Sequence, residues 1–146
     1  MKVYYSINDF NKLPNAVVTT GTFDGVHIGH RKILAQLNQV ARETQGESVL
    51  LTFFPHPRMV LQPDLDLKLI NSQKEKIELL RSTGIEHLII QPFTTEFSRI
   101  SSLDFVRNLL VNQIGAKRLV IGYDHHFGRN REGSFEHLKE HGPLYG

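Results

Sequence analysis

Short apolar runs alternate with amphipathic helical patterns along this chain, which predicts an α/β fold. The runs are rich in β-branched and aromatic residues and lack the strict alternation of a half-buried strand, so they predict strands that are covered on both faces. They span residues 16–20, 48–54, 87–90 and 117–122. Strands that recur at roughly 30–40 residue intervals with helices between them are typical of βαβ units. We therefore expect an open, doubly wound parallel sheet of the Rossmann-like kind.

Three longer helices are predicted between these strands. The first follows residue 30, ends near Gly46, and has an apolar face that consists of Ile33, Leu34, Leu37, Val40 and Ala41. The second begins with a capping box of Ser72 and Glu75, stops near Gly84, and carries Ile77, Leu79 and Leu80. The third begins at Ser101 or Ser102, ends at Gly115, and buries Leu103, Val106, Leu110 and Ile114. Loops are expected around residues 63–66 and 94–99, and exposed helix positions at Lys74, Lys76, Asp104 and Arg107.

Composition and charge narrow the class of protein. The chain has 146 residues, the size of one domain, and a net charge of +2 with no block of Lys and Arg. It contains no cysteine, which excludes disulfides and thiolate chemistry. The first residues lack the apolar core of a signal peptide, and no apolar run reaches the length of a membrane span. We expect a cytoplasmic protein without a nucleic-acid or membrane partner.

The most informative segment is Gly21-Thr22-Phe23-Asp24-Gly25-Val26-His27-Ile28-Gly29-His30. It follows a predicted strand and enters a predicted helix, where free backbone N–H groups and the helix dipole favour a phosphate. His27 and His30 can donate hydrogen bonds to the same anion and stabilise charge that develops during phosphoryl transfer. The segment is neither a Walker A loop nor a dinucleotide fingerprint. The alternative is an ordinary strand-to-helix turn with two surface histidines.

The other predicted strands also end in unusual residues. Pro55-His56-Pro57 follows the second strand, a polar loop around Phe97 follows the third, and residues 122–128 follow the fourth. Ligands of open α/β sheets bind outside the carboxyl ends of the strands. This pattern predicts one site that all four strand ends share.

Three strings in this order resemble a known family. Residues 21–30 resemble the first signature of the HxGH nucleotidyltransferases. Together with Thr52-Phe53-Phe54-Pro55-His56-Pro57 and the string from Val120 to Gly128, they resemble the N-terminal adenylyltransferase module of bacterial FAD synthetases. The resemblance spans nearly the whole chain. It implies an enzyme that transfers AMP from ATP to FMN and so produces FAD and pyrophosphate.

The resemblance also implies roles for individual residues. His27 and His30 would act on the phosphates, and the remaining ATP contacts would come from Gly21, Thr22, Phe23, Asp24, Gly25, Gly29, Asp124 and Arg129. The flavin pocket would consist of Phe54, Pro55, His56, Pro57, Phe97 and Phe127. Mg²⁺ would arrive with ATP and be held by the substrate phosphates, with no protein metal site. Three alternatives stay open: Phe54 and Phe97 as plain core residues, a different acceptor, and a nucleotide-binding domain without turnover.

One feature of the family is missing from this chain after Gly133. The family has a second nucleotide signature there, a Ser-Ser/Thr-x-x-Arg-like string, which this chain lacks. We therefore expect residues 1–146 to be a C-terminally incomplete adenylyltransferase domain. The riboflavin kinase domain that follows in the parent protein would also be absent. Weak or no adenylyltransferase activity is expected of these residues alone, and robust FAD production by them would contradict this expectation.

Overall fold

A computed structural model describes residues 1–23, 28–61 and 72–121, and its centre is a parallel five-stranded sheet. The strands are β1 (Lys2–Tyr4), β2 (Ala16–Thr20), β3 (Glu47–Phe54), β4 (His87–Pro92) and β5 (Ala116–Leu119). Their order in the sheet is β1-β4-β3-β2-β5, and all four pairs are parallel. The four predicted strands are therefore confirmed, with shifts of a few residues at their ends.

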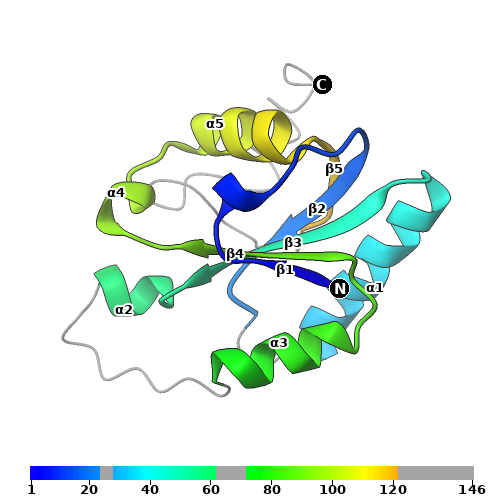
Figure 1. The fold of residues 1–146 in the computed structure, drawn as a ribbon, viewed down its shortest axis with the longest axis horizontal. Helices are drawn as coiled ribbons and strands as arrows, with labels where there is room; N and C mark the ends of the chain where they lie inside the picture. The colour runs from blue at the N-terminus through cyan, green and yellow to red at the C-terminus, as the bar shows by residue number, and fades with distance from the viewer. Residues whose placement is uncertain (24–27, 62–71, 122–146) are drawn as a thin grey trace.

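Helices cover both faces of this sheet (Figure 1). One face carries α1 (Ile28–Glu43) and α3 (Gln73–Arg81), which pack Leu34, Leu37 and Leu80 against β2, β3 and β4. The other face carries the 3₁₀-helix η1 (Ile7–Asp9), α4 (Thr95–Ser98), α5 (Ser102–Asp104) and the π-helix η2 (Phe105–Ile114). The short helix α2 (Pro57–Leu61) follows β3. Two apolar layers enclose the sheet, which confirms the doubly wound fold.

The strand order contains a switch point between β2 and β5. From β2 the chain steps through β3 to β4 in one direction, and it then returns to place β5 on the other side of β2. At such a point the connections leave in opposite directions, and ligands of open α/β sheets bind there, outside the carboxyl ends of the strands. The segment from Gly21 onward leaves β2 at this point.

Helix α1 ends at Glu43, and the left-handed residue after it is Gln45, not Gly46. Gln45 is the residue with a left-handed backbone (φ 57°), and the Gly46 N–H donates to the Ala41 carbonyl at 2.8 Å. This bond and the one from Gln45 to Arg42 form a Schellman-type ending. Gly46 is needed for a different reason, since a Cβ there would lie 2.5 Å from the Asn15 carbonyl oxygen.

The capping box at Ser72 is confirmed by both of its hydrogen bonds. The Glu75 N–H donates to Ser72 Oγ at 3.2 Å, and the Ser72 N–H donates to Glu75 Oε1 at 3.5 Å. Helix α3 ends at Arg81, and the turn after it contains Gly84 at φ 85°. The expected loop at 63–66 lies outside the described residues.

The helix before β5 buries three of the four predicted residues, namely Val106, Leu110 and Ile114. Ser101 caps its start, as expected, and Gly115 ends it at φ 92°. Leu103 is 40% exposed, however, and Phe105 occupies the core in its place. The prediction assumed 3.6 residues per turn. The chain instead winds as a π-helix from Phe105, and Leu103 lies before this π-helix, in α5.

Four short elements were not predicted, and the 3₁₀-helix η1 is one of them. Strand β1 is only three residues long, and it is held by pairing with β4, more than eighty positions away in the sequence. Helix α2 begins at Pro57, where the sequence predicted a turn after a strand and no helix. Helix α4 lies in the expected loop at 94–99, with Thr94 as its cap. Each of these elements is too short to produce a hydrophobic period.

Candidate active site

The turn after β2 is attached to β3 and to the core. The Gly21 N–H donates to the Leu51 carbonyl at 3.1 Å, which extends the pairing of the two strands beyond Thr20. Phe23 then adopts a left-handed backbone (φ 52°) and buries its side chain to 4% exposure among the core residues under α1. A non-glycine residue in this conformation is strained by about 1–2 kcal/mol, and burial of the ring offsets that cost. The backbone of the turn is thus held in one path.

His30 lies in the first turn of α1, beside this anchored segment. Its ring contacts the Phe23 ring, with centroids 4.7 Å apart and planes inclined by 42°. His30 and Gly29 are both partly exposed. The start of a helix has a positive dipole end and is a common binding position for phosphate, so these residues lie where a phosphate would bind. Asp24, Gly25 and His27 lie outside the described residues.

The carboxyl end of β3 carries an apolar surface. Phe54 is the last residue of the strand and is 48% exposed, so it is not a plain core residue. The cis peptide Phe54–Pro55 and the partly exposed His56 lead to Pro57, the first residue of α2. Met59, which sequence analysis did not single out, is 40% exposed on the same short helix. An exposed aromatic and a thioether side chain together can contact a planar apolar ligand.

Phe97 belongs to an aromatic cluster on the other face of the sheet. Its ring centroid lies 5.6 Å from that of Phe53, 5.8 Å from that of Phe93 and 6.4 Å from that of Phe105. Successive residues of a strand point to opposite faces, so Phe53 faces this cluster and Phe54 faces away from it. The structure therefore separates Phe54 from Phe97, and it favours a packing role for Phe97.

Lys76 is not simply an exposed helix residue, as the sequence pattern indicated. It is partly buried, and its Nζ donates to Thr52 Oγ1 at 2.8 Å. Thr52 is 1% exposed and lies near the carboxyl end of β3, where its hydroxyl is 3.3 Å from the Thr22 carbonyl. Lys74, on the same helix, is exposed as expected. The capping box alone could not reveal this contact, because it depends on which turn of α3 reaches β3.

Two buried hydroxyls lie just before the turn. The side chains of Thr19 and Thr20 are 0% and 3% exposed, and neither Oγ1 atom has a hydrogen-bond partner among the described residues. Unpaired buried hydroxyls are uncommon in folded proteins, and each costs about 1–3 kcal/mol. Both lie at the carboxyl end of β2, beside the turn that the sequence singled out.

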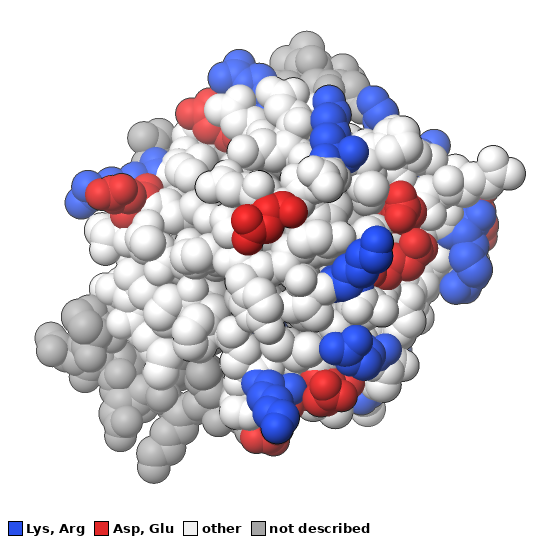
Figure 2. Space-filling view, in the orientation of Figure 1, with Lys and Arg blue, Asp and Glu red and all other residues white. Residues whose placement is uncertain are grey.

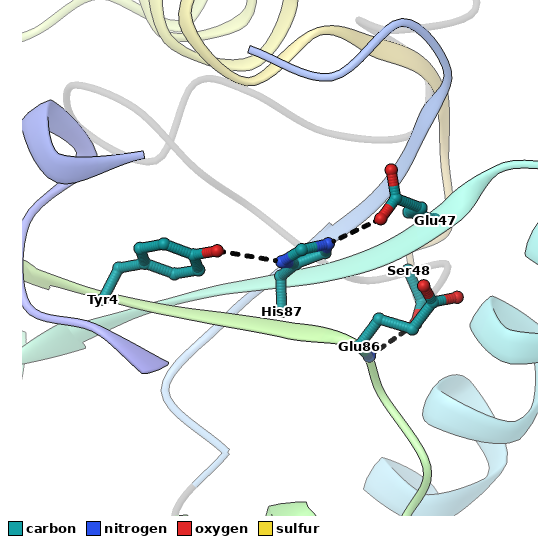
Figure 3. Close-up of polar contacts among 5 residues, drawn as sticks. All are labelled: Tyr4, Glu47, Ser48, Glu86 and His87. Atoms are coloured by element: carbon teal, nitrogen blue, oxygen red, sulfur yellow. Dashed lines mark hydrogen bonds and ion pairs between the residues drawn. The ribbon is translucent and has the colours of Figure 1, made fainter. Parts of the chain in front are cut away.

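A separate polar cluster lies at the opposite, amino edge of the sheet (Figure 3). His87 is buried, with Nε2 3.0 Å from Glu47 Oε1 and Nδ1 3.3 Å from the Tyr4 hydroxyl. The Glu86 N–H donates to Ser48 Oγ at 2.9 Å. Glu47, Glu86 and His87 are the one group in the described ranges whose ligand atoms lie close enough together to hold a metal ion. These residues begin β3 and β4, so they are remote from the strand ends where the candidate site lies.

Charges of both signs are interspersed on the face shown in Figure 2, without a patch of one sign. In the described ranges, no helix is both long enough and apolar enough to cross a membrane.

Comparison with known proteins decides the family. Residues 9–146 match the profile of the family described as FAD synthetase. The chain belongs to this family. It is 33% identical over 146 residues to the bifunctional riboflavin kinase/FMN adenylyltransferase of Buchnera aphidicola subsp. Schizaphis graminum. It is 31% identical over 148 residues to the protein of the same name from Escherichia coli K12.

These matches cover 99% and 100% of this chain, but 47% of each relative. The chain thus spans about half the length of the curated relatives it matches. A crystal structure of a protein described as a macrolide-efflux protein from Streptococcus pneumoniae has the same fold, with a TM-score of 0.81 and 29% identity. That match covers 94% of this chain and 45% of the other.

In this member of the FAD synthetase family, the structure brings together one part of the expected site. The Gly21–Phe23 turn and the start of α1 meet through the contact of Phe23 with His30. The expected contacts Asp124, Phe127 and Arg129 lie outside the described residues. Only the tertiary structure showed that Thr52 contacts the Gly21–Phe23 turn and that Lys76 contacts Thr52.

Proposed function

We propose that this chain binds ATP and FMN and transfers the adenylyl group of ATP to FMN, which produces FAD and pyrophosphate. Membership of the FAD synthetase family supports this proposal. The observation that carries it is the turn from β2 into α1, where Phe23 is held by the core and supports the His30 ring at 4.7 Å. This turn lies at the switch point of the sheet, the usual ligand site of such folds.

The reaction needs positioning and charge stabilisation more than a general base. The FMN phosphate is mostly dianionic at neutral pH, so it can itself act as the nucleophile. One of its oxygens forms a bond to the α-phosphorus of ATP, and the bond from that phosphorus to the bridging oxygen breaks as pyrophosphate leaves. In this proposal the backbone N–H groups at the start of α1 and the His30 ring donate to the phosphate oxygens. His27 would be the second imidazole donor.

Mg²⁺ enters the proposal as part of the substrate, MgATP. The only described group of three potential metal ligands lies at the amino edge of the sheet, away from the turn. Substrate phosphates are the usual ligands of Mg²⁺ in nucleotide-transfer sites. The ion would therefore be held mainly by ATP.

The flavin ring is proposed to lie against the end of β3. Phe54 and Met59 are exposed at and after the carboxyl end of β3, with the Pro55-His56-Pro57 turn between them in the sequence. An isoalloxazine ring is planar and largely apolar, so stacking on Phe54 would remove both surfaces from water. Phe97 and Phe127 stay candidate contacts.

The relatives' names suggest a second activity for the whole protein. They are called bifunctional riboflavin kinase/FMN adenylyltransferases, and this chain matches 47% of their length. We propose that residues 1–146 serve as the adenylyltransferase module. A riboflavin kinase module of the same protein, and a location in the cytoplasm, are parts of the same proposal.

Calorimetric titration with ATP and with FMN tests this function, together with chromatography of FAD formed from the two substrates and Mg²⁺. Binding of both ligands supports the proposal, even where FAD accumulates slowly. Binding of ATP without FMN would favour a nucleotidyltransferase with another acceptor, which titration with other phosphorylated acceptors would identify. Binding of neither ligand would contradict a nucleotide site.

The His30→Phe variant tests the role of the imidazole in that site. Phenylalanine preserves an aromatic contact with Phe23 and removes both ring nitrogens. Loss of a hydrogen bond to a charged phosphate costs about 1.5–3 kcal/mol, so ATP should bind roughly 10–100-fold more weakly. Gln36→Ala, an exposed position on the same helix, is the matched control. Unchanged ATP affinity in His30→Phe would exclude His30 from the phosphate contacts.

A further inference from the structure

The contact between α3 and β3 reaches the nucleotide turn through a directed pair of hydrogen bonds. A lysine ammonium can only donate, so Thr52 Oγ1 accepts from Lys76 at 2.8 Å. A hydroxyl has one proton, and the proton of Thr52 is thereby directed to its other neighbour, the Thr22 carbonyl at 3.3 Å. Lys76 therefore donates to Thr52, and Thr52 donates to the Thr22 carbonyl.

Burial makes this pair of bonds specific. Thr52 is 1% exposed and Lys76 is partly buried, so water has little access to the shared hydroxyl. A hydrogen bond is electrostatically stronger in such surroundings than in water. The Thr52 hydroxyl is therefore held in one orientation, with the lysine on one side and the turn on the other.

The carbonyl that receives this bond belongs to the peptide between Thr22 and Phe23. That peptide is trans, so its C=O and N–H point in opposite directions. A bond that holds the Thr22 carbonyl toward Thr52 also turns the Phe23 N–H away from β3. The Gly21 N–H bond to Leu51 and the buried Phe23 ring hold the two ends of the same segment.

We propose that Lys76 is a positioning residue of the nucleotide site, which acts through Thr52 to orient the Phe23 amide toward the ATP phosphates. The proposal rests on the function proposed above. It assigns a role to a lysine on a helix that lies outside the motif from Gly21 to His30. Lys76 itself need not touch the substrate.

Two pairs of variants test this role in the 146-residue chain. Lys76→Met removes the donor at similar side-chain length, and Lys76→Arg preserves one. Thr52→Val removes the hydroxyl at constant shape, and Thr52→Ser preserves it. Lys74→Met, exposed on the same helix, is the control. Urea unfolding of each variant establishes that it is folded under the binding conditions.

Calorimetry should show about tenfold weaker ATP binding in Lys76→Met and in Thr52→Val, with FMN affinity and Lys74→Met unchanged. The double variant should have the same ATP affinity as the single variant that binds ATP less tightly, because both changes break the same chain of hydrogen bonds. Lys76→Arg and Thr52→Ser should restore most of the affinity. A merely structural role would not produce this coupling or a selective loss of ATP.

The amide signal of Phe23 in ¹H–¹⁵N spectra without any ligand provides an independent readout. It should shift in Lys76→Met and Thr52→Val and stay unchanged in Lys74→Met. If the wild-type chain fails to bind ATP, the proposed function is wrong, and the ligand-free shift still tests whether Lys76 orients the turn. If the wild type binds ATP but Lys76→Met binds it equally well, the positioning role alone is overturned.

Discussion

Among the alanine substitutions of Gly46, Gly84 and Gly115, that of Gly115 should destabilise this protein most. Gly115 connects η2 to β5, the strand beside β2, and has φ 92°. A Cβ there would lie 2.0 Å from the Leu13 carbonyl oxygen and 3.0 Å from the carbonyl carbon. Both contacts are with backbone, which cannot swing aside as a flexible side chain can. The Leu13 N–H also donates to the Ile114 carbonyl at 2.9 Å, which holds the two segments together.

Two further glycines separate the two causes of this effect. Gly84 has a similar left-handed backbone (φ 85°), but the nearest atom to its added Cβ is Asn38 Nδ2 at 3.4 Å, which is ordinary contact. Gly46 has no positive φ, yet its Cβ would lie 2.5 Å from the Asn15 carbonyl oxygen. Gly84→Ala therefore measures backbone strain, and Gly46→Ala measures steric overlap.

The expected magnitudes follow from these differences. Left-handed strain costs about 1–2 kcal/mol, and the smaller freedom of alanine in the unfolded chain returns about 0.4–1 kcal/mol, so Gly84→Ala should lose about 1 kcal/mol. Overlap in a packed region costs about 1–3 kcal/mol, which is the range for Gly46→Ala. Gly115→Ala combines both causes, and we expect a loss of about 3–4 kcal/mol.

Urea unfolding followed by circular dichroism measures these losses. With a dependence of about 2 kcal/mol per molar urea, the midpoint should fall by roughly 0.5 M for Gly84→Ala and 1.5–2 M for Gly115→Ala. Equal losses for these two variants would refute the reasoning, because it attributes their difference to the Leu13 carbonyl alone. A Gly46→Ala variant as stable as the wild type would show that the Asn15 carbonyl can move away from the added Cβ without loss of stability.

Other substitutions test the remaining parts of the fold in the same urea assay. Ser72→Ala removes the cap of α3 and should cost about 1 kcal/mol, and an unchanged midpoint would mean that the capping box contributes nothing. Tyr4→Phe deletes only the hydroxyl beside His87 and should cost about 1 kcal/mol, whereas Tyr4→Ala should cost clearly more, since it also removes the ring contacts. Leu37→Ala opens a cavity under α1 and should cost about 3 kcal/mol. Ile28→Ser, at a side chain 74% exposed on the same helix, should cost less than about 0.5 kcal/mol, and comparable losses for both would contradict the described burial.

The hydrophobic pattern predicted most of the sheet because parallel strands are buried on both faces. Residues 16–20 form β2 as expected, and every one of them is buried. The capping box at Ser72 was equally clear, since its two hydrogen bonds join residues three positions apart. Signals of this kind are local, so the order of residues contains them in full.

The helix before β5 shows the limit of predicting buried positions from a local hydrophobic period. Its apolar period correctly placed Val106, Leu110 and Ile114 in the core, but it also placed Leu103 there and left Phe105 out. Phe105 packs beside Phe97, with ring centroids 6.4 Å apart. Contacts between distant elements thus decided the positions that the local period misplaced.

By itself, the sequence determined the class of fold and the family. The class of fold depends on local periodicity, and the family on three short strings, at residues 21–30, 52–57 and 120–128. Only the tertiary structure decided that Lys76 reaches Thr52, that Phe54 and Phe97 face opposite sides of the sheet, and that His87 joins Glu47 and Tyr4. Each of these depends on strand order and on the packing of helices across the sheet, which bring together residues that no spacing in the sequence relates.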